Sequence, residues 1–352
     1  MNTPNKILVL RFSSIGDIVL ASPLLRVLRA HFPQSQIDFV TRKEYAELVK
    51  SNPNLNYTFE FDVTSGFDGL RALKKTIQKE GYDLIVDIHD SLRSRYLRRF
   101  SGSPEVVTVN KRLIERAVLV KLKKDIYKDS ISVADRYIES LRPYGLQNDG
   151  KGLELHIPDE VQFSAAGKIA KLRLNRFEKT IGLCPSARHE TKQWPRERFV
   201  ELAIRLAKEL DSSILIFGGE ADRTLGAEVA SRIGEAVPGD WTTSFCGQLS
   251  LLETAAAMDF CDVIVSNDSG LMHIANARQR SLVALIGSTV RQFGFLPQDS
   301  DSIVIQRDDL KCRPCSHIGR ASCPEGHFRC MRDIAVEDVY SKVKRLLTAK
   351  AR

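Results

Sequence analysis

An acidic residue that could act as a base, Asp17, stands shortly after the first apolar run of the chain, Lys6 to Phe12. The run has the composition of a buried strand, and the small residues Ser14 and Gly16 follow it as in a turn. Ligands of open parallel α/β sheets bind beyond the carboxyl ends of the strands, so Asp17 is well placed for chemistry. The alternative is that Asp17 only caps a helix.

The loop from Cys184 to Pro195 has the residue types of a phosphate-binding loop. It follows the apolar run Thr180 to Cys184 and contains the hydroxyl of Ser186 and the ammonium of Lys192. Hydroxyls, backbone N–H groups and a lysine together suit phosphate oxygens. The alternative is a surface turn that Trp194 anchors by packing.

Two other strand ends in the second half of the chain could also hold an anionic ligand. The segment Ser266 to His273 predicts a strand, a turn of small residues and a helix N-terminus, which attracts anions. Its candidate residues are Asp268, Ser269, Gly270 and His273. At the end of another run, Phe217 to Asp222, Glu220 could accept hydrogen bonds from ribose hydroxyls. A purely structural role is the alternative for His273.

The segment Asp87 to Ser94 is the corresponding candidate in the first half of the chain. It ends an apolar run and offers His89 and Arg93, which could hold an anionic sugar acceptor. Helix capping by Asp90 or Ser91 is the equal alternative.

Four of the seven cysteines are crowded near the C-terminus, and two histidines lie among them. The cluster comprises Cys312, Cys315, Cys323 and Cys330, with His317 and His327. Thiolate and imidazole are zinc ligands, so a structural zinc ion is one interpretation. The later spacing is not that of a standard zinc ribbon, which leaves free thiols that pack a loop, or redox-sensitive pairing, as alternatives.

These candidates are positioned by short β-branched runs that alternate with helical stretches, the rhythm of a parallel α/β sheet. The expected strands are 6–12, 36–41, 82–88 and 106–109, then 180–184, 213–217, 262–266 and 281–286. Ser22 with Pro23, and Pro195, predict helix starts. We therefore expect two Rossmann-like α/β domains, residues 1–155 and 178–334, with a final helix at 335–349 that could join the first.

Taken together, four motifs in order resemble glycosyltransferase family 9, the bacterial lipopolysaccharide heptosyltransferases. They are Arg11–Asp17, Lys192–Pro195, Gly218–Glu220 and Asn267–His273. The resemblance implies a GT-B fold, with two Rossmann-like domains that face a central cleft, the acceptor held by the first and the nucleotide sugar by the second. It also implies an inverting transfer from ADP-heptose to the inner core of lipopolysaccharide that requires no metal or other cofactor.

The resemblance assigns roles residue by residue. Asp17 is expected to be the general base, with the acceptor held by Ser14, Gly16, His89 and Arg93. The donor is expected to be held by Ser186, Lys192, Glu220, Asp268, Ser269, Gly270 and His273. The loop before Lys192 departs from the family's Pro-Gly-Ala form, because it has Pro185–Ala187 with a serine in the middle. Asp222, close to Glu220, is a second acidic residue that could match the family position assigned to Glu220.

Charge is concentrated in one region of a chain that has 352 residues and a net charge of +8. The segment from Arg93 to Lys128 carries eleven Lys and Arg against three acidic residues. A cationic field of this kind favours an anionic glycolipid acceptor and the inner-leaflet membrane surface, although a solvated helix face is the alternative. No apolar run approaches the roughly 18 residues of a membrane span, so we expect a cytoplasmic protein peripherally associated with the inner membrane.

Two other functions compete with this interpretation. A basic zinc-containing nucleic-acid-binding protein would share the charge and the Cys-x2-Cys spacing. Aromatic residues make up only 7% of the chain, however, which is too few for a base-stacking platform, and no nucleic-acid partner is expected. The closer alternative is a related transferase that uses another nucleotide sugar or acceptor. The cluster that begins at Cys312 favours an enzyme of the second-heptose type.

Overall fold

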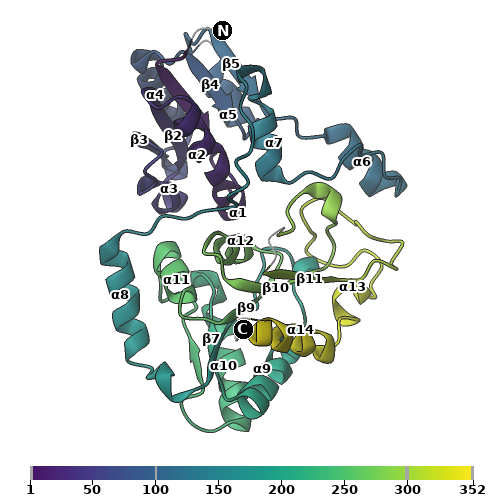
Figure 1. Ribbon diagram of the computed structural model, residues 1–352. Helices are drawn as coiled ribbons and strands as arrows, with labels where there is room; N and C mark the ends of the chain where they lie inside the picture. The colour runs from purple at the N-terminus through teal and green to yellow at the C-terminus, as the bar shows by residue number, and fades with distance from the viewer. Residues whose placement is uncertain (1–2, 100, 298–300, 350–352) are drawn as a thin grey trace. The chain divides into compact units, whose positions relative to one another are not determined.

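A computed structural model describes residues 3–99, 101–297 and 301–349, and the chain forms two compact α/β units (Figure 1). Unit 1 comprises the residues up to 112 together with 131–156, and unit 2 comprises 113–130 and the residues from 157 onwards. The segment 113–130, which the sequence predicts in the first domain, makes its contacts in unit 2.

Unit 1 is built on a five-stranded sheet in the order β3-β2-β1-β4-β5, and every pair of neighbouring strands is parallel. The strands are β1 (Lys6–Leu10), β2 (Gln36–Arg42), β3 (Tyr57–Phe61), β4 (Leu84–Asp87) and β5 (Glu105–Thr108). Its helices are α1 (Ile15–Val19), α2 (Ser22–His31), α3 (Glu47–Lys50), α4 (Gly66–Glu80), α5 (Leu92–Arg98) and α7 (Val133–Glu139). Strand β3 was not expected from the sequence.

Strand β1 lies at the centre of this sheet, which explains its continuous apolar sequence. Leu10 pairs with Val40 of β2 on one side and with Asp87 of β4 on the other. A strand with neighbours on both edges and helices on both faces must be apolar throughout, and residues 7–10 are all fully buried. The loops after β1 and β4 therefore leave the same edge of the sheet, side by side.

Unit 2 contains a six-stranded parallel sheet in the order β11-β10-β9-β6-β7-β8. Its strands are β6 (Lys179–Cys184), β7 (Ser212–Ile216), β8 (Thr242–Ser244), β9 (Val263–Asn267), β10 (Ser281–Ile286) and β11 (Ser302–Gln306). Its helices are α6 (Leu113–Leu122), α8 (Asp159–Ala170), α9 (Arg196–Leu210), α10 (Arg223–Ala236), α11 (Leu251–Met258), α12 (Gly270–Ala277), α13 (Arg329–Arg332) and α14 (Val336–Ala349). Strands β8 and β11 were not expected.

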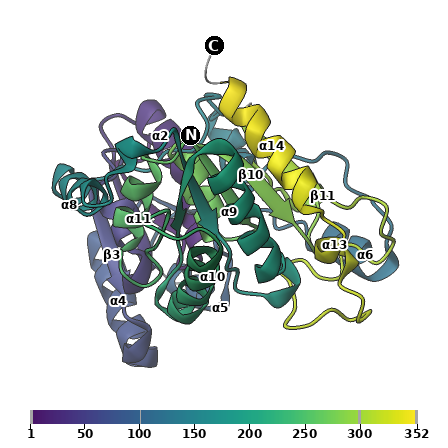
Figure 2. The ribbon, with the colours of Figure 1, turned by 90° about the horizontal axis from the view of Figure 1, so that it is seen from below.

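The last helix, α14, packs on unit 2. It lies against α9 and against strands β9 and β10, and Figure 2 shows it running beside α9. Its apolar residues Val339, Val343 and Leu347 belong to the same buried cluster as Leu206 of α9. The helix thus completes the core of unit 2 rather than joining unit 1.

Two helix starts differ from the sequence expectation by one residue. Ser22 is the first residue of α2 and not its cap, and its hydroxyl donates a hydrogen bond to the carbonyl of Val19 at 2.7 Å. Pro195 precedes α9 as its N-cap instead of being its first residue. Among the described residues, no helix is both long and apolar enough to cross a membrane.

Candidate active site

In unit 1, Asp17 lies in the first turn of α1, just after the carboxyl end of β1. It is the third residue of the helix, and its Oδ2 accepts hydrogen bonds from the N–H of Ser14 at 3.1 Å and from the hydroxyl of Ser14 at 2.9 Å. Asp17 therefore does form the capping contact that was the structural alternative. Its second oxygen, Oδ1, receives the Nη2 of Arg11 at 2.6 Å.

Arg11 keeps this carboxyl group ionised. Only 18% of the Asp17 side chain is exposed, and burial by itself would raise its pKa. The charge of Arg11 and the hydrogen bonds from Ser14 outweigh burial and lower the pKa of Asp17 below its usual value. Arg11 is itself fixed, because its Nη1 donates to the carbonyl of Ile88 at 2.7 Å, beyond the end of β4.

His89 stands at the same edge of the sheet and is held as a neutral imidazole. Its Nδ1 accepts the N–H of Phe12 at 2.9 Å, so Nε2 carries the ring proton. Burial, together with the positive charges of Arg11 and Lys111, lowers the pKa of His89 to about 3. His89 is therefore a hydrogen-bond donor through Nε2 and not a cation at neutral pH.

The other candidates in unit 1 differ from one another in exposure and in the residues that they contact. Ser14 is bound to Asp17, and Gly16 is buried inside α1. Arg93 is exposed on α5 and makes no ion pair with any residue that the structure describes, whereas Arg95 and Arg98 both pair with Asp90.

Two residues of this site were not among the sequence candidates. Arg11 lies within the first motif, and its position six residues before Asp17 was the available signal. Tyr137 of α7 lies beside Arg11, whose guanidinium is 5.8 Å from the centre of the tyrosine ring. Tyr137 is 120 residues from Asp17 in the chain, so no local pattern could have indicated it.

In unit 2, Lys192 and Asp268 form a buried ion pair between the loops that follow β6 and β9. The Nζ of Lys192 is 2.8 Å from Oδ2 of Asp268, and 15% and 6% of the two side chains are exposed. Thr289, beyond β10, donates its hydroxyl to the same oxygen at 2.6 Å. Burial opposes ionisation, but Lys192 and Thr289 outweigh it and lower the pKa of Asp268.

Asn267 joins the loop after β6 to the end of β9. Its Oδ1 accepts the N–H of Trp194 at 3.0 Å, and its Nδ2 donates to the carbonyl of Pro185 at 2.8 Å. Trp194 is buried, and its indole N–H donates to Ile334. The packing role that was the alternative for Trp194 is therefore real, and it fixes the loop that carries Ser186 and Lys192.

The N-terminus of α12 supplies further groups that can bind an anion. Gly270 is the first residue of this helix and Ser269 its N-cap. The hydroxyl of Ser269 does not cap the helix, and it is buried without a hydrogen-bond partner among the described residues. His273 is buried one turn inside, with its ring edge-on to Phe295 at 6.3 Å. A helix N-terminus, a lysine and an unused hydroxyl together suit a phosphate group.

Glu220 lies apart from this group of contacts, at the end of β7. Its side chain is 76% exposed and pairs with Arg223 at 2.7 Å. Asp222 has the structural role here, because it accepts the N–H of Gly219 at 2.8 Å. A Cβ atom at Gly218 would lie 2.8 Å from the Cys246 sulfur, so packing alone requires this glycine.

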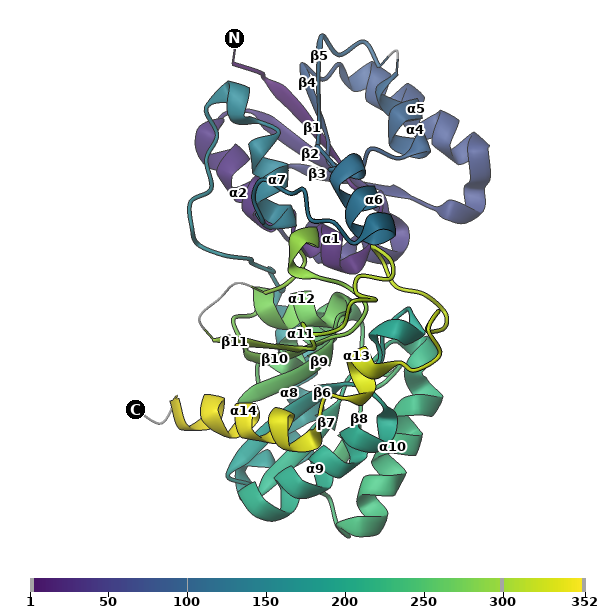
Figure 3. The same cartoon turned by 90° about the vertical axis from the view of Figure 1, so that its right-hand side faces the viewer.

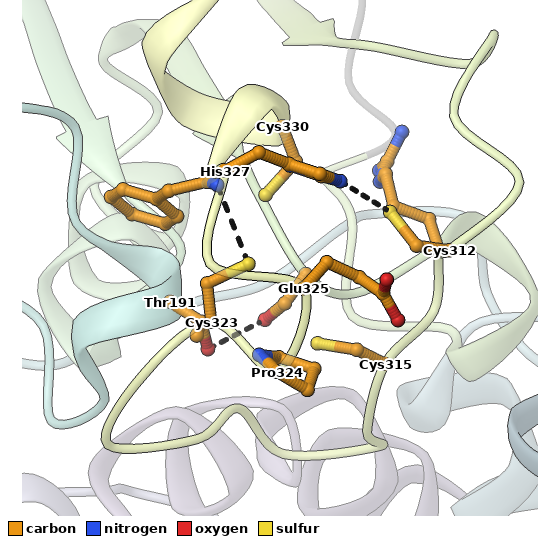
Figure 4. Close-up of a pocket in the computed structure, with 11 residues that line it drawn as sticks. Thr191, Cys312, Cys315, Cys323, Pro324, Glu325, His327 and Cys330 are labelled. Carbon is orange, nitrogen blue, oxygen red and sulfur yellow. Dashed lines mark hydrogen bonds between the residues drawn. The ribbon is translucent and has the colours of Figure 1, made fainter.

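The cysteine cluster lines a pocket of unit 2 (Figure 4). Cys312, Cys315, Cys323 and Cys330 all contribute to its wall, as does His327, and all four thiols are free. His317, which the sequence grouped with them, is not one of the lining residues. Within residues 3–99, 101–297 and 301–349, no three His, Cys, Asp or Glu side chains are already grouped closely enough to hold a metal ion.

A family model and the sequences of known relatives both identify heptosyltransferases as the proteins that this chain resembles. A model of glycosyltransferase family 9 (heptosyltransferase) matches residues 70–324. The lipooligosaccharide heptosyltransferase 2 of Haemophilus influenzae is 26% identical over 97% of this chain and 99% of its own. The lipopolysaccharide heptosyltransferase 2 of Escherichia coli is 26% identical over 97% of this chain and 98% of its own.

Solved structures show the same fold. A family 9 glycosyl transferase from Veillonella parvula has a TM-score of 0.81, with 24% identity over 98% of each chain. The ADP-heptose lps heptosyltransferase II of E. coli has a TM-score of 0.74, with 24% identity over 99% of this chain and 100% of its own. Two parallel-sheet α/β domains with these neighbours constitute the GT-B fold.

Proposed function

The chain belongs to glycosyltransferase family 9, the heptosyltransferase family, and on this premise we propose that it transfers a heptose from ADP-heptose to the inner core of lipopolysaccharide. The observation that carries the proposal is Asp17, a largely buried carboxylate that Arg11 and Ser14 hold in its ionised form. The relatives named heptosyltransferase 2 support addition of the second heptose, with a heptosyl-Kdo acceptor.

In the proposed reaction, Asp17 accepts the proton of an acceptor hydroxyl while the hydroxyl oxygen attacks the anomeric carbon of the donor. The bond from that carbon to the ADP phosphate oxygen breaks as the new glycosidic bond forms, and ADP leaves with the bonding electrons. Attack on the face opposite ADP inverts the configuration at the anomeric carbon. General-base assistance of this kind contributes about 10²- to 10⁴-fold to a rate.

The groups of unit 2 are suited to the departing diphosphate. Lys192 can exchange its ion pair with Asp268 for phosphate oxygens, and the N-terminus of α12 adds backbone donors near Ser269. These groups would supply the positive potential that the leaving group needs. We also assign Ser186 and His273 to the donor.

The remaining candidate residues keep proposed roles in holding the substrates. Glu220 would hold donor hydroxyls after releasing Arg223. In unit 1, Ser14, Gly16, His89 and Arg93 are assigned to the acceptor, to which the neutral His89 offers its Nε2–H.

A further part of the proposal is that the protein works at an anionic membrane surface, where its acceptor would be anchored. Helix α6 carries exposed apolar side chains, with 56% of Leu113, 74% of Ile114 and 71% of Leu122 accessible. The exposed basic residue Lys121 lies on the same helix, and Lys124 follows two residues after its end. Exposed apolar and basic side chains on one helix are the composition of a helix that lies in a lipid interface.

The test is incubation of the purified protein with ADP-heptose and a deacylated Kdo-lipid A or heptosyl-Kdo-lipid A acceptor, followed by product mass and ADP release. The wild type should add one heptose, and Asp17→Asn should lose about 10²- to 10⁴-fold in kcat while still binding ADP. An Asp17→Asn variant with wild-type kcat would overturn the assignment of the base. Nucleotide binding without transfer from ADP-heptose would instead favour a family member that uses another sugar donor.

A further inference from the structure

The cysteine pocket has no part in the proposed transfer, yet its composition is unusual for a packed loop. Four cysteines and His327 converge there from residues 312–330, although this segment has little regular structure. Figure 4 shows the four sulfur atoms turned toward the same space. The other three cysteines, at positions 184, 246 and 261, are buried elsewhere in unit 2.

Hydrogen-bond donors already lie against two of these sulfurs. The N–H of Phe328 donates to the sulfur of Cys323 at 3.4 Å, and Nε2 of His327 is 3.9 Å from the sulfur of Cys312. Thiolates that bind a metal are characteristically supported by N–H donors of this kind, which spread their negative charge. A neutral thiol that only fills space does not need them.

A buried cation also lines the pocket. The side chain of Arg313 is 4% exposed, and the carboxylate with which it pairs, that of Asp308, is 3.7 Å away on a largely exposed residue. Its hydrogen bonds are to neutral acceptors, the carbonyl of Arg307, the carbonyl of Thr289 at 2.7 Å and the side chain of Gln306 at 3.1 Å. A buried guanidinium needs nearby negative charge. Four thiolates bound to one divalent ion would supply this negative charge, because the thiolates and the ion together have a net charge of about −2.

We propose that Cys312, Cys315, Cys323 and Cys330 bind one thiophilic divalent metal ion, zinc or ferrous iron, as a tetrathiolate site. Tetrahedral sulfur coordination is typical of these two metals. Because the described side chains are not grouped at binding separations, the sulfurs would have to move closer together to bind the ion, and a change of side-chain rotamer is the smallest movement of this kind. His327 and Phe328 then act as the outer donors and not as ligands.

The metal would fix the segment that supports the donor-binding loops of unit 2. Thr191, next to Lys192, accepts the N–H of Arg320 at 2.8 Å, and Arg313 holds the carbonyl of Thr289. Lys123 also donates to the carbonyls of Cys312 at 3.0 Å and Pro314 at 2.6 Å, which ties the α6 segment to the same loop (Figure 3). The site is therefore structural. Only its effect on donor binding rests on the proposed function.

The experiment is elemental analysis of the full-length protein, purified without a histidine tag under reducing conditions. We expect one ion per chain, and the element found will distinguish zinc from iron. Cys315→Ser and Cys323→Ser should each reduce the content to less than about a tenth of an ion. Cobalt added to the metal-free protein should give thiolate-to-cobalt charge-transfer absorption that both variants lack.

Cys261→Ala is the matched control, because Cys261 is buried in unit 2 away from the pocket. It should retain the metal, and circular dichroism should show that all three variants are folded. Wild-type protein with neither a stoichiometric metal nor the cobalt spectrum would overturn the proposal, as would disulfides among the four cysteines in the intact mass of the reduced preparation. The proposal would also be overturned if Cys261→Ala lost as much metal as Cys315→Ser and Cys323→Ser. None of these readouts depends on transferase activity, so they separate this proposal from the assignment of the reaction.

Discussion

Asp17 and Arg11 depend on each other, since each is largely withdrawn from water and each neutralises the other. A carboxylate in this position would become protonated if burial acted alone, and a protonated base cannot accept a proton. Arg11 thus sets the pH range in which Asp17 can work. This dependence separates the residue that takes the proton from the residue that positions and charges it.

Replacement of Arg11 by methionine tests this dependence. The pKa of Asp17 should rise toward and beyond its usual value, so the acid limb of the profile of kcat/KM against pH should move to higher pH. Since a depressed pKa stabilises the fold above the unfolded pKa, the variant should also lose about 3–5 kcal/mol at neutral pH, and less as the pH falls through the acid range. An acid limb that stays in place would contradict the role of Arg11.

The pair of Lys192 and Asp268 allows binding and stability to be separated. Lys192→Met leaves Asp268 buried without its cation, which should cost about 3–5 kcal/mol in the free energy of unfolding and also raise the KM for the donor. The double variant Lys192→Met/Asp268→Asn removes the unpaired charge. It should recover most of the stability without recovering donor affinity. Urea unfolding and donor titration measure the two effects, and joint recovery would show that Lys192 acts only through folding.

Residue types at strand ends were enough to predict that Asp17, Lys192 and Asp268 lie in loops that follow the strands, because parallel strands deliver their loops to one edge of a sheet. Their roles in the reaction stay predictions. The partners of these residues were harder to predict. Thr289 and Tyr137 come from segments with no distinguishing pattern, and only the fold brings them to the ion pairs. Glu220 fitted its motif, but its surroundings show an exposed ion pair with Arg223.

At the scale of elements, most of the expected strands are fully buried ones, whose apolar runs have no other explanation, although the expected strand β5 is a largely exposed edge strand. The three unexpected strands lie at or near sheet edges. Residues 57–60 of β3 are exposed or half-buried and only Phe61 is buried, β8 has three residues, and β11 is only half-buried throughout. Such strands have mixed composition because one side faces solvent, so composition does not separate them from loops.

Helix α6 offers a test of membrane association at the same scale. Ile114→Glu and Leu122→Glu each replace an exposed apolar side chain with a charge that an anionic surface repels. Both should weaken co-sedimentation with vesicles that contain phosphatidylglycerol and leave thermal stability unchanged. Phe163→Glu is the matched control, because Phe163 is 76% exposed on α8. Equal loss in this control, or no loss in the α6 variants, would count against α6 as the contact.

At the scale of the whole molecule, the two units have separate cores and separate candidate sites. The buried cluster that includes Leu8 and Leu10 lies within unit 1, and the cluster that includes Leu183 and Val265 lies within unit 2. A ligand that binds only one unit should suppress local opening in that unit first, because a ligand stabilises the structure to which it is bound.

Hydrogen exchange with and without ADP tests whether unit 2 binds the nucleotide and unit 1 binds the acceptor. If unit 2 holds the nucleotide, ADP should slow amide exchange at residues 186–192 and 268–273 and around Thr289, where the phosphate contacts are proposed. Residues 14–17 and 89 of unit 1 should exchange at unchanged rates until the acceptor is added. Lys192→Ala should abolish the protection by ADP while Asp17→Asn preserves it, because Lys192 is assigned to the nucleotide and Asp17 to the acceptor. Protection by ADP that began at residues 14–17 would reverse the assignment of donor and acceptor to the two units.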